Sequence, residues 1–213
     1  MSIALCITCY DLDFYLLDGL LEQFKNQTDT PDEIIISSSG IKNHLLKKYK
    51  NVQINNKNVP IKNTNQEQRC VQSVARNAGA SMSESDYIMF FDVDDIPHPQ
   101  KIEFCKHHIQ GYDFLLHNYQ INNSKFENIK SLNIDTYHNF SINSTHTNLI
   151  VDNNFAICHG HLTVKSEIFK SLKYQQISFG KKEMGEDGKF CQDLVRNGYR
   201  GIFLNVPLIS YSQ

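Results

Sequence analysis

Apolar and polar positions alternate in blocks along the first half of the chain, and these blocks predict strands and helices in turn. Continuous apolar runs predict buried strands, and apolar positions that recur every three to four residues predict helices with one buried face. The strands are expected at 2–9, 33–37 and 87–91, with a weaker strand at 52–55. Helices are expected after Asp11, at 42–50 and at 66–83, and 56–65 is expected to be a polar loop.

Two of these helices have a readable inner face. Asp11 is expected to cap the first helix, whose apolar stripe consists of Leu12, Leu16, Leu20 and Phe24. The long helix is expected to bury Cys70, Val71, Val74 and Ala78. The alternation of strand and helix predicts the α/β class, with a mostly parallel sheet and right-handed crossovers. No G-x-G-x-x-G loop follows the first strand, which removes the main support for a dinucleotide-binding or P-loop function.

The second half has a weaker pattern and a polar, asparagine-rich stretch at 119–154 with one weak strand near Leu149. Strands are expected at 113–117, 155–164 and 199–206, and helices at 99–109, after Ser166 as a cap, and at 187–197. A loop with two glycines is expected at 179–186, and Gly198 is expected to close the last helix in the left-handed conformation. No internal repeat or linker divides the 213 residues, so we expect a single domain.

Composition narrows the choice of partners and compartment. The chain has 21 basic and 23 acidic residues and a formal net charge of −2, which argues against nucleic acid held by bulk electrostatics. No run reaches transmembrane length, and no basic region precedes the first apolar stretch. Of the six cysteines, Cys6 and Cys9 have a C-x-x-C spacing but would point to opposite faces of a strand. We therefore expect free thiols and a reducing, cytoplasmic compartment.

The strongest chemical signal follows the third apolar run, where the sequence reads Asp92-Val93-Asp94-Asp95. Asp92 and Asp94 have side chains on the same side of an extended backbone, and two carboxylates that close repel each other unless a cation lies between them. The carboxyl end of a buried parallel strand is also where open α/β sheets bind ligands. A metal-assisted site is the first hypothesis, with Asp95 as either a further ligand or the cap of a turn.

Three motifs in order along the chain resemble the GT-A glycosyltransferases, particularly their large inverting, family-2-like group. Arg76, Asn77 and Gly79 match an R-N-x-G motif, the D-x-D-D sequence from Asp92 follows it, and Glu186-Asp187 comes about ninety residues later. The form of the motifs is also similar to glycan-building enzymes of large DNA viruses of algae, in which this chain would be the N-terminal part of a longer protein.

The resemblance implies a Rossmann-like GT-A fold, a nucleoside-diphosphate sugar as donor, with UDP preferred, and a glycan or glycoprotein as acceptor. It implies Mn²⁺ or Mg²⁺ on Asp92 and Asp94, with Asp187 as the general base. Glu186 is the alternative base, since Asp187 also suits a helix cap. Residues 1–97 would bind the nucleotide and 98–213 the acceptor. The residues expected to contact the donor are Thr8, Tyr10, Asp11, Ser38, Arg76, Asn77, Asp92, Val93 and His159.

The chain departs from the family pattern at two places. Relatives commonly end their second strand in Asp-Asp-Gly-Ser, whereas this chain has three serines and Gly40, so hydroxyl or backbone groups must read the base there. Many relatives carry a late histidine on the metal, but none follows Asp187. His159 and His161 would alternate on one face of the predicted strand, where they either contact the diphosphate, acceptor or metal, or form buried hydrogen bonds.

Two other functions fit parts of the pattern. A haloacid-dehalogenase-type phosphatase also has a D-x-D sequence after a buried strand, and Asp92 would then be a phosphorylated nucleophile. That motif usually lies on the first strand, and Ile96 occupies the place where such enzymes have threonine or valine. A catalytically inactive module that binds nucleotide sugars is the non-enzymatic alternative.

Overall fold

The computed structural model describes residues 1–121, 126, 134–142, 148–176 and 185–211. Within these ranges one large sheet runs in the order β3-β4-β2-β1-β5-β12-β7-β13-β6, with β8 paired to β13. Its strands are β1 Ile3–Tyr10, β2 Glu33–Ser39, β3 Asn51–Ile54, β4 Lys57–Gln66, β5 Tyr87–Asp92, β6 Ile96–Pro97, β7 Phe114–Ile121, β8 Thr136–Tyr137, β12 Thr163–Lys165 and β13 Gly201–Tyr211. A small sheet consists of β9 Phe140–Ile142, β10 Leu149–Val151 and β11 Asn154–Ala156.

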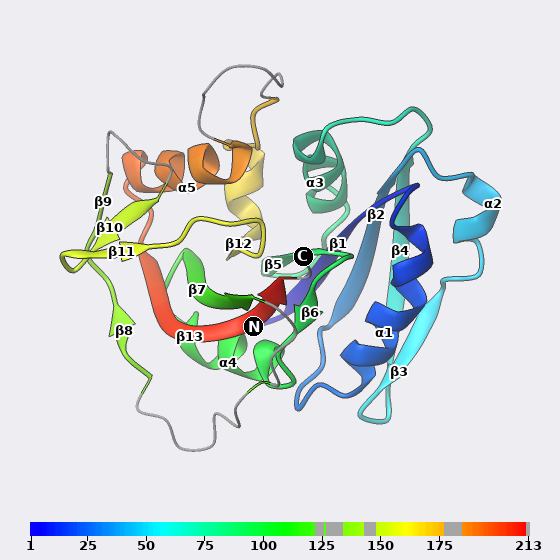
Figure 1. Cartoon of the computed structure of the whole chain (residues 1–213), viewed down its shortest axis with the longest axis horizontal. Helices are drawn as coiled ribbons and strands as arrows, with labels where there is room; N and C mark the ends of the chain where they lie inside the picture. Colours follow the sequence, from blue (N-terminus) through cyan, green and yellow to red (C-terminus); the bar gives the residue numbers. More distant parts are fainter. Residues whose placement is uncertain (122–125, 127–133, 143–147, 177–184, 212–213) are drawn as a thin grey trace.

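The centre of the large sheet is parallel, as the alternating pattern predicts. Strands β4, β2, β1 and β5 run in the same direction, and β7 and β13 are parallel to each other, with β12 inserted antiparallel between β5 and β7. The helices are α1 Leu17–Lys25, α2 Asn43–Leu46, α3 Gln72–Ala80, α4 Lys101–His108 and α5 Glu186–Arg196, with 3₁₀ turns η1 Phe14–Leu16 and η2 Ser166–Lys170. The α/β class with a mostly parallel central sheet is confirmed (Figure 1).

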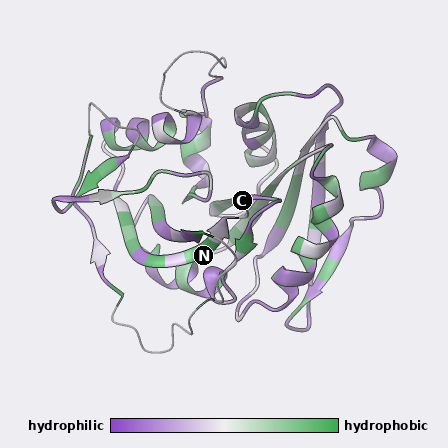
Figure 2. Cartoon of the chain, viewed as in Figure 1, coloured by the Kyte–Doolittle hydropathy of each residue, from purple (hydrophilic) through white to green (hydrophobic). Residues whose placement is uncertain are grey.

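Helices cover both faces of the sheet. One apolar cluster joins the sheet to α1 and α4, and a second joins the opposite face to α3, η2 and α5. The flanking helices each carry apolar and hydrophilic residues (Figure 2). Cys9 belongs to the first cluster and Cys6 to the second, so the two thiols lie on opposite faces as expected. None of the helices in the described ranges is long and apolar enough to cross a membrane.

The expected polar loop at 56–65 is wrong, because these residues form most of β4. A two-residue turn at Asn55 and Asn56, with φ of 47° and 62°, joins β3 to β4 as a hairpin. Asparagine tolerates this left-handed conformation better than other residues with a side chain. The strand was hard to recognise because only Val59 and Ile61 of its residues are buried.

The first and third helices begin later than predicted. Leu12 is 63% exposed rather than part of the core stripe, and a 3₁₀ turn precedes α1, so Asp11 caps no helix. Helix α3 begins at Gln72, which leaves Cys70 and Val71 outside it. The residues that α3 buries are Ser73, Ala75, Arg76, Gly79 and Ala80, not Val74 and Ala78.

The predicted strand at 155–164 is also wrong, since β11 ends at Ala156 and β12 begins at Thr163. His159 and His161 therefore lie in the connection between two short strands. Helix α5 begins one residue earlier than predicted, with Gly185 at the N-cap, so Asp187 belongs to its first turn. Ser166 does not cap η2; its hydroxyl donates to the Ser85 carbonyl at 2.6 Å. Most of the predicted loop at 179–186 lies outside the described residues.

The C-terminal end of α5 agrees with the sequence. Gly198 has φ of 76°, its N–H donates to Val195 O at 3.0 Å, and the Tyr199 N–H donates to Leu194 O at 3.1 Å. This pair of bonds is a Schellman motif, which satisfies carbonyls that the end of the helix leaves open.

Candidate active site

The acidic motif begins where the parallel strands β1 and β5 end. Asp92 is the last residue of β5 and pairs in register with Thr8 of β1. The Thr8 hydroxyl donates a short hydrogen bond to Asp92 Oδ1. Because neighbouring parallel strands end at the same edge of the sheet, a ligand bound there meets both side chains.

Arg76 of α3 links Asp92 to the two acidic residues that begin α5. Its Nη2 donates to Asp92 Oδ1 and Oδ2 at 3.1 and 3.0 Å, and its Nη1 donates to Glu186 Oε1 at 3.1 Å and to Asp187 Oδ1. The Arg76 side chain is only 1% exposed. The structure therefore brings these four predicted residues together, and the expected contact of Arg76 with the nucleotide or sugar stays a prediction.

A socket of protein groups fixes the Arg76 guanidinium. The Arg76 Cζ lies 5.5 Å from the ring centroid of buried Tyr174, within cation–π distance. A Cβ on Gly160 would lie 2.2 Å from Arg76 Nη2 and 2.8 Å from Asp92 Oδ2, so only glycine fits there. Sequence reasoning missed both residues, because neither has a motif; Gly160, between two histidines, offered the only signal.

Asn77, next to Arg76, has a structural partner. Its Nδ2 donates to the Tyr174 carbonyl at 2.8 Å, and its Oδ1 accepts from the Tyr174 N–H at 3.0 Å. These two bonds hold the segment that contributes Tyr174 to the socket. The Asn77 amide thus holds the backbone in this structure, and its expected contact with the donor stays a prediction.

Electrostatics distinguish the carboxylates around Arg76. Burial raises the pKa of Asp187 to about 6; the Arg76 charge opposes the rise, and the Glu186 and Asp92 carboxylates add to it. Burial acts to raise the pKa of Asp92, but Arg76, His161 and the Thr8 hydrogen bond together outweigh it, and the net shift is downward. Asp92 is thus a firm anion, whereas Asp187 can accept a proton near neutrality.

Oxygen and nitrogen ligands for a cation gather beside this cluster. Ligand atoms of Asp92, Asp95 and His161 lie within 4.8 Å of one another. Desolvation and the adjacent Asp95 and Asp92 carboxylates raise the pKa of Asp94 to about 6, and its side chain is exposed. Carboxylates with one imidazole suit Mn²⁺ and are compatible with Mg²⁺. The residues present therefore fit a divalent cation, with Asp95 and His161 closer to Asp92 than sequence reasoning expected.

The two histidines of the CHGH sequence differ in their surroundings. His159 Nε2 lies 2.8 Å from the His117 carbonyl, and its Nδ1 accepts from the His161 N–H at 3.0 Å. Both ring nitrogens of His159 thus have partners inside the protein, and its expected contact with the donor stays a prediction. His161 Nε2 lies 2.7 Å from Asp95 Oδ2, and its buried Nδ1 has no hydrogen-bond partner in the described part of the chain. Burial lowers the pKa of both histidines to about 3, so both rings are neutral at pH 7.

Tyr10 and Asp11 follow β1 at the same edge of the sheet. The Tyr10 hydroxyl is buried and has no hydrogen-bond partner among the described residues, and burial raises its pKa. Asp11 is exposed, and its Oδ1 lies 3.9 Å from Arg69 Nε. A Cβ on Gly40, whose φ is 75°, would lie 3.3 Å from the Asp11 Cγ. Asp11 thus faces the end of β2 and remains accessible.

Ser38 and Val93 are placed differently from Asp11. The Ser38 hydroxyl donates to Asn65 Oδ1 at 2.9 Å and to the Thr64 carbonyl at 3.2 Å, so it connects β2 to β4 and its side chain is buried. Val93 is 4% exposed, and its N–H donates to the Thr8 carbonyl at 3.1 Å. Both side chains are therefore packed inside the protein, and the expected donor contacts of these two residues stay predictions.

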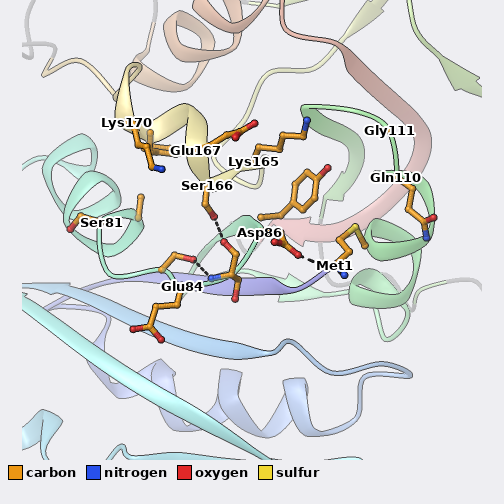
Figure 3. Close-up of a pocket in the computed structure, with 15 residues that line it drawn as sticks. Met1, Ser81, Glu84, Asp86, Gln110, Gly111, Lys165, Ser166, Glu167 and Lys170 are labelled. Atoms are coloured by element: carbon orange, nitrogen blue, oxygen red, sulfur yellow. Dashed lines mark hydrogen bonds and ion pairs between the residues drawn. The ribbon is translucent and has the colours of Figure 1, made fainter.

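A cavity of about 1020 Å³ lies at the opposite end of the strands, near the beginnings of β1 and β5 (Figure 3). Several of its charged groups have partners: Lys165 Nζ lies 2.7 Å from Asp113 Oδ1, and the Met1 amino group lies 3.7 Å from Asp86 Oδ2. Its described lining contains none of the predicted site residues. The predicted residues Thr8, Asp92 and Asp94 lie instead at or beside the carboxyl ends of β1 and β5.

A mostly parallel central sheet with helices on both faces is the arrangement of the Rossmann-like GT-A fold. The family model for glycosyl transferase family 2 matches residues 5–172. The chain belongs to that family, although the match ends before the Glu186-Asp187 pair. No protein of curated function matches the chain significantly in sequence.

Solved structures with this fold include those of S. aureus TarS. The chain is 15% identical to TarS 1–349 in complex with UDP-GlcNAc, with a TM-score of 0.74, and the alignment covers 100% of this chain and 59% of TarS 1–349. The chain is 16% identical to the same fragment in complex with UDP, with a TM-score of 0.71, and the alignment covers 100% of this chain and 61% of that fragment. The chain thus spans about 60% of the length of the TarS fragment to which it is similar.

Proposed function

We propose that the chain is a metal-dependent glycosyltransferase that moves a sugar from a UDP-sugar to a hydroxyl of a glycan or glycoprotein, with inversion at the sugar carbon. The observation that carries this proposal is the Arg76 guanidinium, which gathers Asp92, Glu186 and Asp187 at the carboxyl edge of the sheet. Membership of glycosyl transferase family 2 supports sugar transfer. The TarS complexes with UDP and UDP-GlcNAc support UDP as the nucleotide.

Asp92 and Asp94 would hold Mn²⁺ or Mg²⁺, and Asp95 with His161 lies next to Asp92. When bound, the cation supplies positive charge that neutralises the diphosphate as it leaves the sugar. Asp94 has the exposure needed to reach a cation shared with a nucleotide. Its raised pKa is the expected property of a carboxylate crowded by others before a cation binds.

Asp187 would be the general base, with Glu186 as the alternative. The acceptor oxygen forms a bond to the anomeric carbon, the bond from that carbon to the diphosphate oxygen breaks, and the acceptor proton passes to Asp187. Attack from the face opposite the leaving group inverts the anomeric carbon. Asp187 supports this role because 26% of its side chain is exposed and only its Oδ1 contacts Arg76 in the described residues.

The domain organisation, donor contacts and compartment are also proposals. Residues 1–97 would bind the nucleotide, with Thr8, Tyr10 and Asp11 nearest to it, and 98–213 would receive the acceptor. All six cysteines are free thiols, which supports a reducing compartment such as the cytoplasm. The similarity to enzymes of large DNA viruses of algae stays a prediction.

A donor screen tests the proposal. Thermal unfolding is measured with a panel of nucleotide sugars, with and without Mn²⁺, and UDP release is then followed for any donor that stabilises the protein. Asp94→Ala should abolish metal-dependent UDP binding by calorimetry, whereas Asp187→Asn should keep UDP-sugar affinity and lose about 10²-fold or more in transfer. Undiminished binding by Asp94→Ala, or normal turnover by Asp187→Asn, contradicts the respective assignment.

The same assays address the other two functions. Turnover of p-nitrophenyl phosphate that depends on Asp92 would support the phosphatase, which family membership disfavours. Binding of a UDP-sugar without transfer or hydrolysis would support the inactive module.

A further inference from the structure

Arg76 makes more contacts with acidic groups than a simple ion pair requires. The two ends of its guanidinium serve different elements: Nη2 contacts Asp92 at the end of β5, and Nη1 contacts Glu186 and Asp187 at the start of α5. The Arg76 guanidinium thus contacts Glu186 and Asp187, which lie 110 and 111 positions further along the sequence. A fork of this kind fixes the orientation of carboxylates as well as supplying charge.

The guanidinium has little freedom to move. It is 1% exposed, it lies against the Tyr174 ring, and the missing side chain of Gly160 provides its space. Asn77 in turn holds the backbone of Tyr174 through two hydrogen bonds. A side chain so enclosed offers almost no surface to a ligand, so its effect on a reaction is expected to pass through the carboxylates it holds.

We propose that Arg76 is a positioning residue: it holds Asp187 by Oδ1, so that the other carboxylate oxygen faces the acceptor hydroxyl. The inference rests on the proposed function for its catalytic meaning. It assigns the arginine of the R-N-x-G motif to the base at the start of α5 and not to the donor. Gly160 is part of the same arrangement, because a side chain there would occupy the space of the Arg76 guanidinium.

The charged and titratable groups around Asp187 come from several elements. They are Arg76 and Asp92 from the first half of the chain, and Glu186, Tyr174, Cys191 and Tyr211 from the second. Arg76 is the group among them that lowers the pKa of Asp187. Weakening the Arg76 contact should therefore raise the pKa of Asp187 further, which a change in packing alone would not do in a defined direction.

The test uses Arg76→Lys. Lysine keeps the positive charge, but its ammonium group lacks the fork that lets arginine contact Asp92 and the acidic residues of α5 together. Its matched control is Arg196→Lys, because Arg196 is a half-exposed arginine on α5 that pairs with Asp193 at 3.1 Å. We expect Arg76→Lys to lower kcat for transfer by about 10-fold or more while UDP affinity changes by less than about 3-fold. In the Asp187→Asn background the same substitution should lower turnover by a smaller factor than in the wild type, because the effect that passes through Asp187 is absent and only the contact with Asp92 remains. Arg196→Lys should resemble the wild type.

A second readout does not depend on activity. The Asp187 carboxyl is titrated by carbon-13 NMR, with its resonance assigned through Asp187→Asn, in the wild type and in Arg76→Lys. A higher pKa in the variant supports positioning, even where no donor is turned over and the proposed function itself fails. An unchanged pKa, a loss of UDP affinity as large as the loss of kcat, or additivity with Asp187→Asn overturns it. If Arg76→Lys does not fold, Gly160→Ala, whose Cβ would displace Nη2, is measured in the same way and decides the question.

Discussion

Gly160 and Gly19 differ in what a methyl group would meet. A Cβ at Gly160 would lie 2.2 Å from Arg76 Nη2, whereas at Gly19, an exposed position inside α1, nothing lies within 4 Å. We expect Gly160→Ala to destabilise the fold by about 1–3 kcal/mol through overpacking. Gly19→Ala should stabilise it by about 0.5–1 kcal/mol, because alanine favours a helix interior. Urea denaturation of both variants checks this, and equal stabilities would mean that the Gly160 space is not needed.

Residue-scale prediction succeeded where a residue type and its spacing carry the chemistry, and failed where burial decides. The sequence indicated that the acidic motif follows a buried strand, which in the structure ends at Asp92, and that a helix begins at Asp187, where the structure begins it one residue earlier at Glu186. It did not indicate that Arg76 is enclosed, because an arginine in a helix is usually exposed. It also gave His159 and His161 equal weight, although the free ring nitrogen of His161 becomes evident only once the fold places His117 and Asp95.

The β3–β4 hairpin offers a test at the scale of an element. Asn56 has φ of 62° at the turn, while Asn58 lies two residues later in β4 with its side chain also exposed. Asn56→Val should cost about 1–2 kcal/mol, because a β-branched residue resists the left-handed conformation. Asn58→Val should be neutral or slightly stabilising, since valine favours strands. Equal effects in urea denaturation would contradict the turn geometry.

The sequence predicts strands that consist of continuous apolar residues, but it does not predict strands that are mostly polar. β1, β2 and β5 are buried on both faces and were recognised from their continuous apolar sequences. β4 has mostly polar residues and was mistaken for a loop. The stretch 155–164 reads as one strand because most of its residues are apolar, but residues 157–162 form a connection in which His161 contacts Asp95.

At the scale of the whole molecule, the candidate site exists only where the two halves of the chain meet. Arg76 and Asp92 come from the first half and Asp187 from the second, and β12 of the second half pairs with β5 of the first. Sequence order supplied all three residues but not their contact, which depends on α3 and α5 approaching the same edge of the sheet (Figure 1). The family resemblance implied that these motifs meet; the ion pairs through Arg76 had no counterpart in the sequence pattern.

This convergence sets the expected pH dependence of transfer. The pKa of Asp187 is raised from 3.8 to about 6 by burial, against the effect of Arg76 and with help from Glu186 and Asp92. A base must be deprotonated to accept a proton, so activity is present above about pH 6 and is lost as the pH falls through that value. We expect kcat/KM to fall about 10-fold per pH unit below about 6 in the free enzyme. Initial rates of UDP release between about pH 4.5 and about pH 8 measure this, and the residual activity of Asp187→Asn should lack that limb. If kcat/KM falls only near pH 4, the proton acceptor is an ordinary solvated carboxylate. The contact between the two halves of the chain would then not raise the pKa of the base.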